Sequence, residues 1–336
     1  MFVRFMSTPS DAVGIPGVWQ NKNGPGCRVP INALPLLGDS TPNIRGNEEL
    51  RGVLKNPVIH PWVSDFLMEH QRTILIKALT REGFSAWSPP GSGKTLCGLV
   101  WLAADPGVKL VITKAAARGT WREEIRKYTT YEPVVLTGQD PTKMFNGKGD
   151  FGNPTKIYIT AWETLIYWRD FLTEMGIGSL VMDEIHWAKN PKRVKPVIMQ
   201  NGATRFIPLE NTAAAAMLIS QKAKRRFGLT ATPIPNRPRD LWAQLDLVEP
   251  WQWGTKHEFG VRYCAGFQDT YGWKYDGLSN REELATRLRW SKHKTSQQAI
   301  SACLPPKRRQ VVYLDQSEQN RPSAFKQEIK RTARTG

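Results

Sequence analysis

The sequence has few cysteines, no long apolar run and a shortage of acidic side chains. None of its four cysteines forms a Cys-x-x-Cys pair, so we expect neither a zinc site nor a disulfide framework, and a reducing cytoplasmic setting is the default. No run of about 18 apolar residues occurs, and the N-terminus lacks the apolar region of a signal peptide. We therefore expect no membrane partner.

Basic side chains outnumber acidic ones, with 47 Lys+Arg against 30 Asp+Glu and a net charge of +17 in 336 residues. That length suggests about two domains of ~150 residues each. The charge indicates a polyanionic partner, although solubility alone explains it equally well. The excess gathers in two stretches. The stretch 187–227 contains nine basic residues and one acidic residue, and the stretch 251–336 contains 16 basic and 8 acidic residues. Each stretch therefore has a net charge of +8.

The apolar pattern divides the chain into three parts. Residues 1–55 are rich in Gly, Pro and Asn and indicate a small irregular or β-type appendage. Residues 56–250 alternate short apolar strands with helices, which is typical of an α/β fold with a parallel sheet covered on both faces. Beyond Pro250 the alternation stops, and 251–336 indicate a helical, loop-rich, basic extension. The expected strands are 84–87, 108–113, 134–136, 156–160, 179–182 and 226–230, and the expected helices are 65–79, one from 94, 118–128, 161–175, 212–222 and 239–248.

A glycine-rich segment, Ser88 to Thr95, follows the first of these strands and opens a helix. Its backbone can surround phosphate oxygens, and the helix N-terminus adds the positive end of its dipole. Lys94 is predicted to reach the β- and γ-phosphates of ATP, and Thr95 to hold Mg²⁺. The general pattern has Gly where Ser88 stands, and a chance glycine-rich turn is the alternative. The loop residues predicted to bind the nucleotide are Pro90, Gly91, Ser92 and Gly93.

An acidic pair, Asp183 and Glu184, ends another apolar strand. A phosphate loop needs a second Mg²⁺-binding carboxylate at the end of a neighbouring strand, and Asp183 is predicted to bind Mg²⁺ through water. Glu184 is predicted to orient and deprotonate the attacking water. His186 is predicted to link the nucleotide site to the loops beyond. A solvated turn is the alternative interpretation of the pair.

The order of these motifs resembles that of the Swi/Snf-type ATPases of helicase superfamily 2. The resemblance covers roughly residues 57–314 and implies a RecA-like P-loop NTPase lobe that binds ATP, Mg²⁺ and DNA. In that family a glutamine upstream of the phosphate loop reads adenine, and Gln71 is similar to it. The resemblance rests on His70-Gln71, Val111–Lys114 with Thr120–Glu124, Tyr158–Leu165, Asp183–Asn190, and Leu229–Asn236 with Asp240–Trp242.

Polar side chains follow the strand ends on one side of the expected sheet, where parallel α/β proteins place their ligands. Hydroxyl, amide and ammonium groups there suit DNA phosphates, which give affinity without sequence specificity. Solvated loops are the alternative. Thr230 and Thr232 are predicted to couple the phosphate state to DNA contacts, and Trp121 and Trp187 are interpreted as packing residues rather than base-stacking ones. The predicted DNA-binding residues are Thr113, Lys114, Thr160, Lys189 and Asn190.

Segments between residues 262 and 284 resemble the annealing-helicase (HARP-like) branch and its phage relatives, and 15–35 are similar to the small substrate-binding domain of that branch. In the family a second RecA-like lobe with an arginine finger follows a Leu-Pro linker, to which Leu304–Lys307 is similar. Only 30 of the 336 residues follow Pro306, whereas a lobe needs ~150. We therefore expect the first lobe only, with the second on another chain or lost by truncation. Loss of an arginine finger costs ~10³–10⁵ in rate, so ATP hydrolysis by the isolated chain should be weak.

Together, the residues and the resemblance predict the ATP-binding lobe of a DNA-dependent ATPase, a translocase or annealing helicase acting on double-stranded or forked DNA. The alternative is a non-motor DNA-binding or regulatory protein that kept an ATP pocket. A P-loop kinase is disfavoured because acceptor and lid elements are not found and it leaves Leu229–Asn236 unexplained. The expected location is the cytoplasm of a bacterial or phage-infected cell, or the nucleus of a eukaryote.

Overall fold

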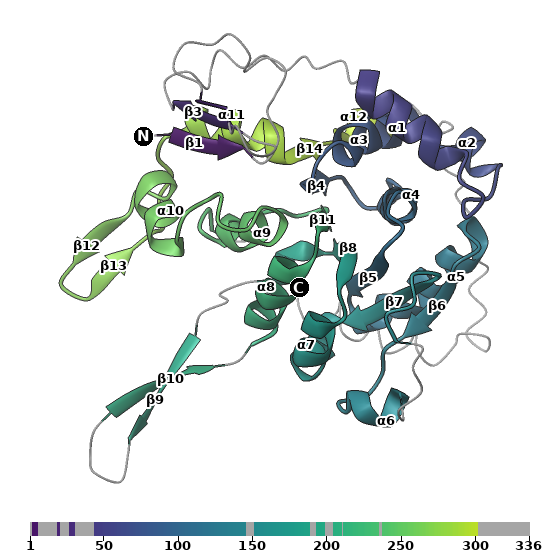
Figure 1. Ribbon diagram of the computed structural model, residues 1–336. Helices are drawn as coiled ribbons and strands as arrows, with labels where there is room; N and C mark the ends of the chain where they lie inside the picture. Colours follow the sequence, from purple (N-terminus) through teal and green to yellow (C-terminus); the bar gives the residue numbers. More distant parts are fainter. Residues whose placement is uncertain are drawn as a thin grey trace, which may run out of the picture. The chain divides into compact units, whose positions relative to one another are not determined.

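The computed structural model describes residues 2–5, 19–20, 27–30, 44–145, 151–188, 193–198, 204–209, 211–234 and 237–301 (Figure 1). The chain divides into two compact units, Met1–Ile300 and Ser301–Gly336. Of the second unit only Ser301 is described, so the predicted linker Leu304–Lys307 lies outside the described residues.

A seven-stranded sheet forms the centre of the first unit. Its strand order is β14-β4-β11-β8-β5-β7-β6. Every pairing is parallel, which confirms the predicted parallel α/β class. The strands are β4 (Gly83–Trp87), β5 (Val108–Thr113), β6 (Glu132–Val135), β7 (Lys156–Ala161), β8 (Ile177–Asp183), β11 (Arg225–Thr230) and β14 (Lys292–Lys294).

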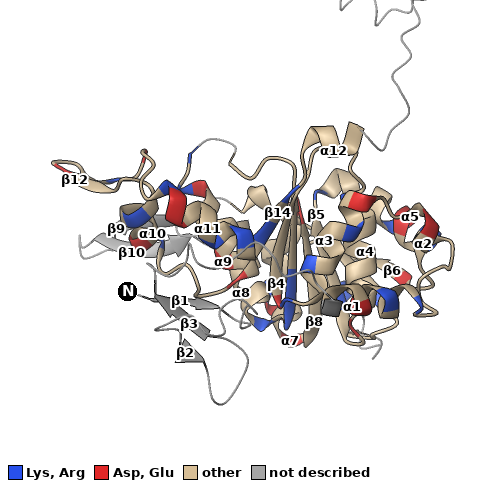
Figure 2. Cartoon of the chain, turned by 90° about the horizontal axis from the view of Figure 1, so that it is seen from above, with Lys and Arg blue, Asp and Glu red and all other residues tan. Residues whose placement is uncertain are grey.

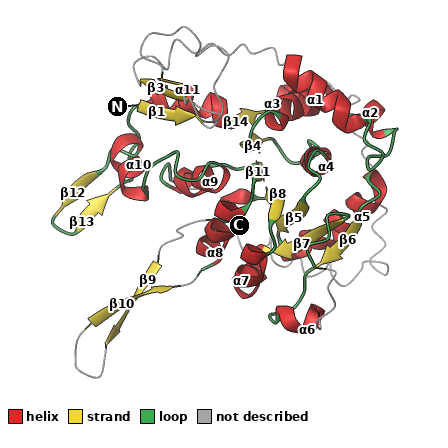
Figure 3. Cartoon of the chain, in the orientation of Figure 1, coloured by secondary structure: helices red, strands yellow, loops and turns green. Residues whose placement is uncertain are grey.

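Helices cover both faces of this sheet, because alternate residues of each strand point to opposite sides (Figure 3). In β5, Val111 belongs to the hydrophobic cluster under one set of helices, whereas Leu110 and Ile112 belong to the cluster on the opposite face. The first set is α1 (Ile44–Leu54), α3 (Glu69–Leu79), α4 (Lys94–Ala103) and α5 (Arg118–Tyr128), and the second is α7 (Leu165–Glu174), α8 (Thr212–Lys222) and α9 (Asp240–Val248). None of the helices in the described part of the chain is long and apolar enough to cross a membrane.

The helix expected over 65–79 is interrupted in the structure. A short helix, α2 (Val63–Phe66), ends at Leu67, whose backbone is extended, and α3 begins at Glu69. The Gln71 side chain accepts a hydrogen bond from the Met68 backbone N–H at 2.9 Å, which caps the new helix start. Apolar spacing continues across this break, so periodicity alone does not reveal it.

The N-terminal segments form a small antiparallel sheet of β1 (Phe2–Phe5), β3 (Cys27–Pro30) and β2 (Trp19–Gln20), in that order. Helix α1, which the predicted boundary at residue 55 assigns to the appendage, packs against α3 instead. Its Leu50 and Val53 are buried in the same cluster as the first helical layer. The lobe therefore begins earlier in the chain than the apolar pattern indicates.

The predicted boundary at residue 250 also differs from the structure. The segment beyond it forms α10 (Lys256–Tyr263), the hairpin β12 (Phe267–Asp269) and β13 (Gly272–Lys274), α11 (Arg281–Ser291), β14 and α12 (Gln297–Ser301). Strand β14 joins the edge of the central sheet beside β4. Tyr263 and Leu288 share a hydrophobic cluster with Trp87 of β4. Residues 251–300 are thus part of the lobe rather than a separate extension.

Some of the basic residues counted in the two charged stretches lie inside the protein, and Figure 2 shows Lys and Arg positions within the central sheet. Arg226 of β11 is 8% exposed and donates to the carbonyl oxygens of Ser220 and Ala223 at the C-terminus of α8. Arg287 is 9% exposed and lies over the Trp253 ring, 4.1 Å from its centroid. These two guanidinium groups stabilise the fold, so the net charge overstates the basic surface.

Candidate nucleotide site

The glycine-rich loop joins β4 to α4 at the carboxyl edge of the sheet. Gly91 and Gly93 have φ angles of 76° and 73°, a left-handed conformation that favours glycine. A Cβ atom on Gly93 would lie 2.1 Å from the Gln71 Nε2 atom, so this position also lacks room for a side chain. The predicted loop therefore has the backbone that a phosphate cradle requires.

Two side chains of α3 contact the backbone of the phosphate loop. The Ser92 carbonyl oxygen lies 2.9 Å from His70 Nε2 and accepts a hydrogen bond from Gln71 Nε2 at 3.0 Å. Both side chains are buried, with 6% and 4% of their surface exposed. Gln71 thus bridges the start of α3 and the phosphate loop, and its predicted reading of adenine stays a prediction.

Lys94 lies between the loop and the acidic pair. Its ammonium group donates to the carbonyl oxygens of Ser88 at 3.0 Å and Pro89 at 3.1 Å. Burial lowers the pKa of Lys94, while the negative charges of Glu184 and Asp183 oppose that shift. The lysine therefore faces both the phosphate loop and the carboxylates at the end of β8, as its predicted role requires.

Asp183 ends β8 with its carboxylate held by three donors. Thr113 Oγ1 and Trp121 Nε1 both donate to Oδ2 at 2.9 Å, and the Glu184 backbone N–H donates to Oδ1 at 3.0 Å. Burial raises the pKa of Asp183, and the hydrogen bonds from Trp121 and Thr113 act in the opposite direction. The sequence analysis singled out Asp183 and interpreted Trp121 as a packing residue, but it did not predict the contact between them, which spans 62 residues of sequence.

Glu184 and His186 form a polar cluster with the end of β11. Glu184 has φ 50° and ψ 48°, a left-handed conformation that costs a non-glycine residue roughly 1–3 kcal/mol. His186 Nδ1 lies 3.1 Å from Glu184 Oε2, 2.9 Å from Thr230 Oγ1 and 3.4 Å from Thr232 Oγ1. The nearby His186 imidazole is the main cause that lowers the pKa of Glu184, and burial acts in the opposite direction.

Thr230 touches both halves of the site. Its hydroxyl lies beside His186, and its backbone carbonyl accepts a hydrogen bond from the Ser88 N–H of the phosphate loop at 3.0 Å. This follows from the strand order, because β11 lies between β4 and β8. Thr230 therefore contacts both the phosphate loop and the acidic turn, and its predicted coupling role stays a prediction.

The side chains around Lys94 fit a nucleotide-bound Mg²⁺. Magnesium is usually held in proteins by one or two carboxylates, with phosphates and water completing its shell. Asp183 offers a carboxylate at the carboxyl edge, and the half-buried Thr95 follows Lys94 at the start of α4. Among the described residues, no group of three or more His, Cys, Asp or Glu side chains could hold a metal ion together.

The structure separates the predicted DNA-binding residues. Thr113 and Thr160 are fully buried, so their hydroxyls lie in the interior, and Thr113 contacts Asp183 instead. Lys114 has its ammonium group 5.2 Å above the ring of Trp187, which is 42% exposed. Lys189 and Asn190 lie outside the described residues. Trp121, 1% exposed, lies in the core as interpreted.

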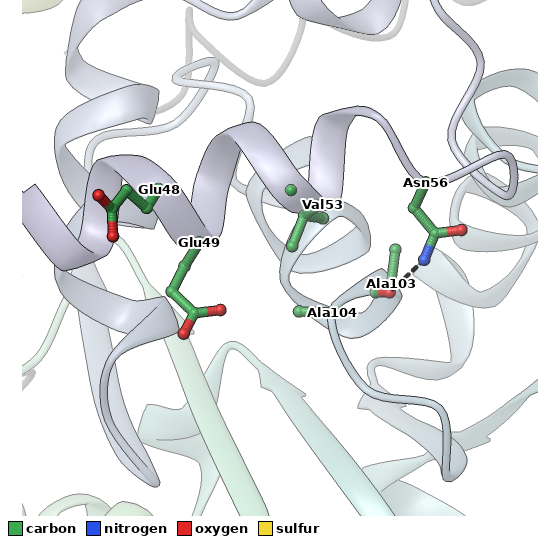
Figure 4. A pocket seen from close by; sticks show the side chains of 7 residues that line it. Glu48, Glu49, Val53, Asn56, Ala103 and Ala104 are labelled. Atoms are coloured by element: carbon green, nitrogen blue, oxygen red, sulfur yellow. Dashed lines mark hydrogen bonds between the residues drawn. The ribbon is translucent and has the colours of Figure 1, made fainter.

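A hollow elsewhere on the lobe is separate from this site. Figure 4 shows its lining, to which α1 contributes Glu48 and Glu49 and the C-terminal end of α4 contributes Ala103 and Ala104. Asn56 donates to the Ala103 carbonyl at 3.3 Å. The phosphate loop lies at the opposite end of α4, about 15 Å away at 1.5 Å per residue. Its acidic lining also makes this hollow unsuitable for phosphate.

Comparison with known proteins shows which families the chain resembles. A family model described as SNF2-related domain matches residues 203–334. The SWI/SNF-related matrix-associated actin-dependent regulator of chromatin subfamily A-like protein 1 of Drosophila melanogaster is 27% identical over 76% of the chain and 32% of its own length. The DNA annealing helicase and endonuclease ZRANB3 of Bos taurus is 26% identical over 74% of the chain and 22% of its own length. The chain thus spans about a third or less of these relatives.

The fold has a counterpart among solved structures. The Sulfolobus solfataricus SWI2/SNF2 ATPase core in complex with dsDNA superposes with a TM-score of 0.51 and 20% identity, over 71% of the chain and 47% of that structure. At this identity the likeness concerns the fold, which is the RecA-like fold that the motifs imply. In sequence and in fold, the chain is therefore similar to the Swi/Snf-type ATPases of helicase superfamily 2, and the similarity concerns their first RecA-like lobe.

Proposed function

We propose that the chain is the ATP-binding lobe of a double-stranded-DNA translocase or annealing helicase, which hydrolyses ATP with Mg²⁺. The observation that carries the proposal is the convergence of Lys94, Asp183 and the Glu184–His186–Thr230 cluster on one edge of the sheet. The similarity to a protein named as a DNA annealing helicase and to an ATPase core in complex with dsDNA supports the choice of DNA. The same relatives disfavour a non-motor DNA-binding protein.

Each side chain has a role that its surroundings favour. The Lys94 ammonium group would give up its hydrogen bonds to the two loop carbonyls and donate to phosphate oxygens instead. Glu184, whose pKa His186 lowers, would stay ionised and accept a proton from the attacking water. Thr95 and Asp183 would hold Mg²⁺, which neutralises charge on the phosphates when bound. Thr230 and Thr232 would pass the state of this site to the DNA side through His186.

A second RecA-like lobe, on this polypeptide or another, would complete the site with an arginine finger. The exposed pair of Lys114 and Trp187 is the described feature best suited to a DNA phosphate, since it combines a cation with an accessible ring. Lys189 and Asn190 follow it directly in the chain and stay part of the proposal. The buried free thiols of Cys97 and Cys264 are compatible with a reducing compartment such as the cytoplasm or nucleus.

Measuring ATP hydrolysis with and without double-stranded DNA, in the presence of a second lobe, tests the proposal. We expect Lys94→Ala and Glu184→Gln each to remove the DNA-stimulated rate, and Glu184→Gln to retain nucleotide binding because it leaves the loop intact. Lys143→Ala is the matched control, since that side chain is 84% exposed and lies outside the site. A stimulated rate that survives Lys94→Ala would refute the motor.

A further inference from the structure

We infer that Trp121 and Thr113 are positioning residues that decide which oxygen of Asp183 faces the metal. The inference rests on the proposed function, because it concerns the same Mg²⁺ site. A carboxylate has about four lone-pair positions, two on each oxygen. The Thr113 hydroxyl and the Trp121 indole N–H occupy both positions of Oδ2.

Of the four lone-pair positions of the carboxylate, one on Oδ1 stays available to the metal. The Glu184 backbone N–H occupies the other position of Oδ1 at 3.0 Å. Three protein donors therefore fix the carboxylate plane and leave a single direction open. Partners of this kind orient a metal-binding group, and their loss typically lowers metal affinity 10–100-fold.

The phosphate-loop helix is shaped to admit the Trp121 indole. Trp121 lies in α5 with only 1% of its surface exposed. Gly98 of α4, one turn after Lys94, faces it, and a Cβ atom at that position would lie 2.9 Å from the indole Cη2 atom. A glycine inside a helix is unfavourable, so its presence here is explained by the space that the indole needs. The indole thus packs on the helix that carries Lys94 while it bonds the carboxylate of Asp183.

A second indole provides a contrast on the same residue. Trp162 is also fully buried, and its Nε1 donates to the Asp183 backbone carbonyl at 2.7 Å. It therefore fixes the end of β8 without contacting the carboxylate. Replacing either tryptophan by phenylalanine removes one buried N–H donor to Asp183, but only Trp121→Phe frees a carboxylate oxygen.

The experiment measures binding of a fluorescent ATP analogue to the full chain as Mg²⁺ is titrated. We expect Trp121→Phe to raise the half-saturating Mg²⁺ concentration about 10-fold or more, with metal-free nucleotide binding unchanged. Trp162→Phe should shift that concentration less than threefold. Thr113→Val should act in the same direction as Trp121→Phe, and Thr113→Ser, which keeps the hydroxyl, should restore the wild-type value.

The outcomes separate this inference from the proposed function. Equal Mg²⁺ curves for Trp121→Phe and Trp162→Phe, with the wild type still responding to Mg²⁺, would overturn the positioning role alone. A wild-type chain that binds no nucleotide would overturn the proposed function together with it. If Trp121→Phe fails to fold, the comparison of Thr113→Val with Thr113→Ser tests the positioning role instead, because both side chains are close in size to threonine. Equal Mg²⁺ responses for that pair would again refute the role.

Discussion

A hydrogen bond between the phosphate loop and the last strand of the sheet offers a sharp test of the fold. Ser88 donates through its hydroxyl to Thr295 Oγ1 at 2.9 Å, across 207 residues of sequence. The two residues are 1% and 4% exposed, and the Thr295 N–H also donates to the Trp87 carbonyl at 2.9 Å. The perturbation is a double-mutant cycle of Ser88→Ala and Thr295→Val.

The expected magnitude follows from burial. Removing one hydroxyl leaves the other buried without its partner, at a cost of about 1–3 kcal/mol, whereas removing both is closer to neutral. Each single substitution should therefore lower the free energy of unfolding by about 1.5 kcal/mol, and the double substitution by no more than that, because it leaves no unpaired hydroxyl. The coupling energy should be about 1.5 kcal/mol, inside the range of roughly 0.5–3 kcal/mol for residues in contact.

Urea denaturation of the four proteins measures these free energies. A control cycle that pairs Ser88→Ala with Thr286→Val, which removes a hydroxyl bonded only within α11, should be additive. If the effects of Ser88→Ala and Thr295→Val add to within about 0.5 kcal/mol, the two hydroxyls are not bonded in solution. The assignment of β14 to the edge of this sheet would then lose its main side-chain support.

Three further predictions use other contacts. Gly83→Ala would place a Cβ atom 1.9 Å from the Val248 carbonyl oxygen and should destabilise the protein by about 3 kcal/mol or more. In the control variant Gly119→Ala, the new Cβ atom meets nothing within 4 Å and should stabilise α5 by about 0.5–1 kcal/mol. Thermal unfolding measures both changes. Arg226→Leu leaves two carbonyls at the end of α8 unpaired and should lower stability by about 2–4 kcal/mol without weakening DNA binding, so reduced DNA affinity in the folded variant would contradict its structural role. His186→Ala removes the imidazole that lies 3.1 Å from Glu184 Oε2 and lowers the pKa of Glu184, so the acid limb of the ATPase pH profile should move to higher pH; an unmoved limb would show that Glu184 does not control it.

The pattern of apolar residues was sufficient to predict the limits of several strands and helices in the centre of the fold. The strand at 108–113 and the helices at 118–128 and 212–222 have the predicted limits, because a buried parallel strand is a continuous apolar run and each helix has clear flanking signals. Strand β14 was missed because Lys292–Lys294 has no strand signature. Its position is determined by pairing with β4, a contact between segments about 200 residues apart.

The sequence predicted which side chains lie at the carboxyl edge but not where each one points. The sequence analysis expected Thr113 after a strand end on the ligand side of the sheet, yet its hydroxyl turns inward to Asp183 rather than outward to a ligand. The basic stretch over 187–227 likewise combines surface residues with Arg226, whose guanidinium group caps a helix. Side-chain direction and long-range partners depend on packing, which a one-dimensional pattern does not contain.

The two edges of the central sheet have a consequence for how the protein behaves at high concentration. An outermost strand can pair with the same strand of another molecule and start aggregation, and charged side chains or proline oppose this. Strand β14 consists of Lys292, His293 and Lys294, and β6 at the far edge begins with Glu132 and Pro133. Both edges therefore disfavour intermolecular strand pairing, so we expect aggregation through sheet extension to be slow even in concentrated solution.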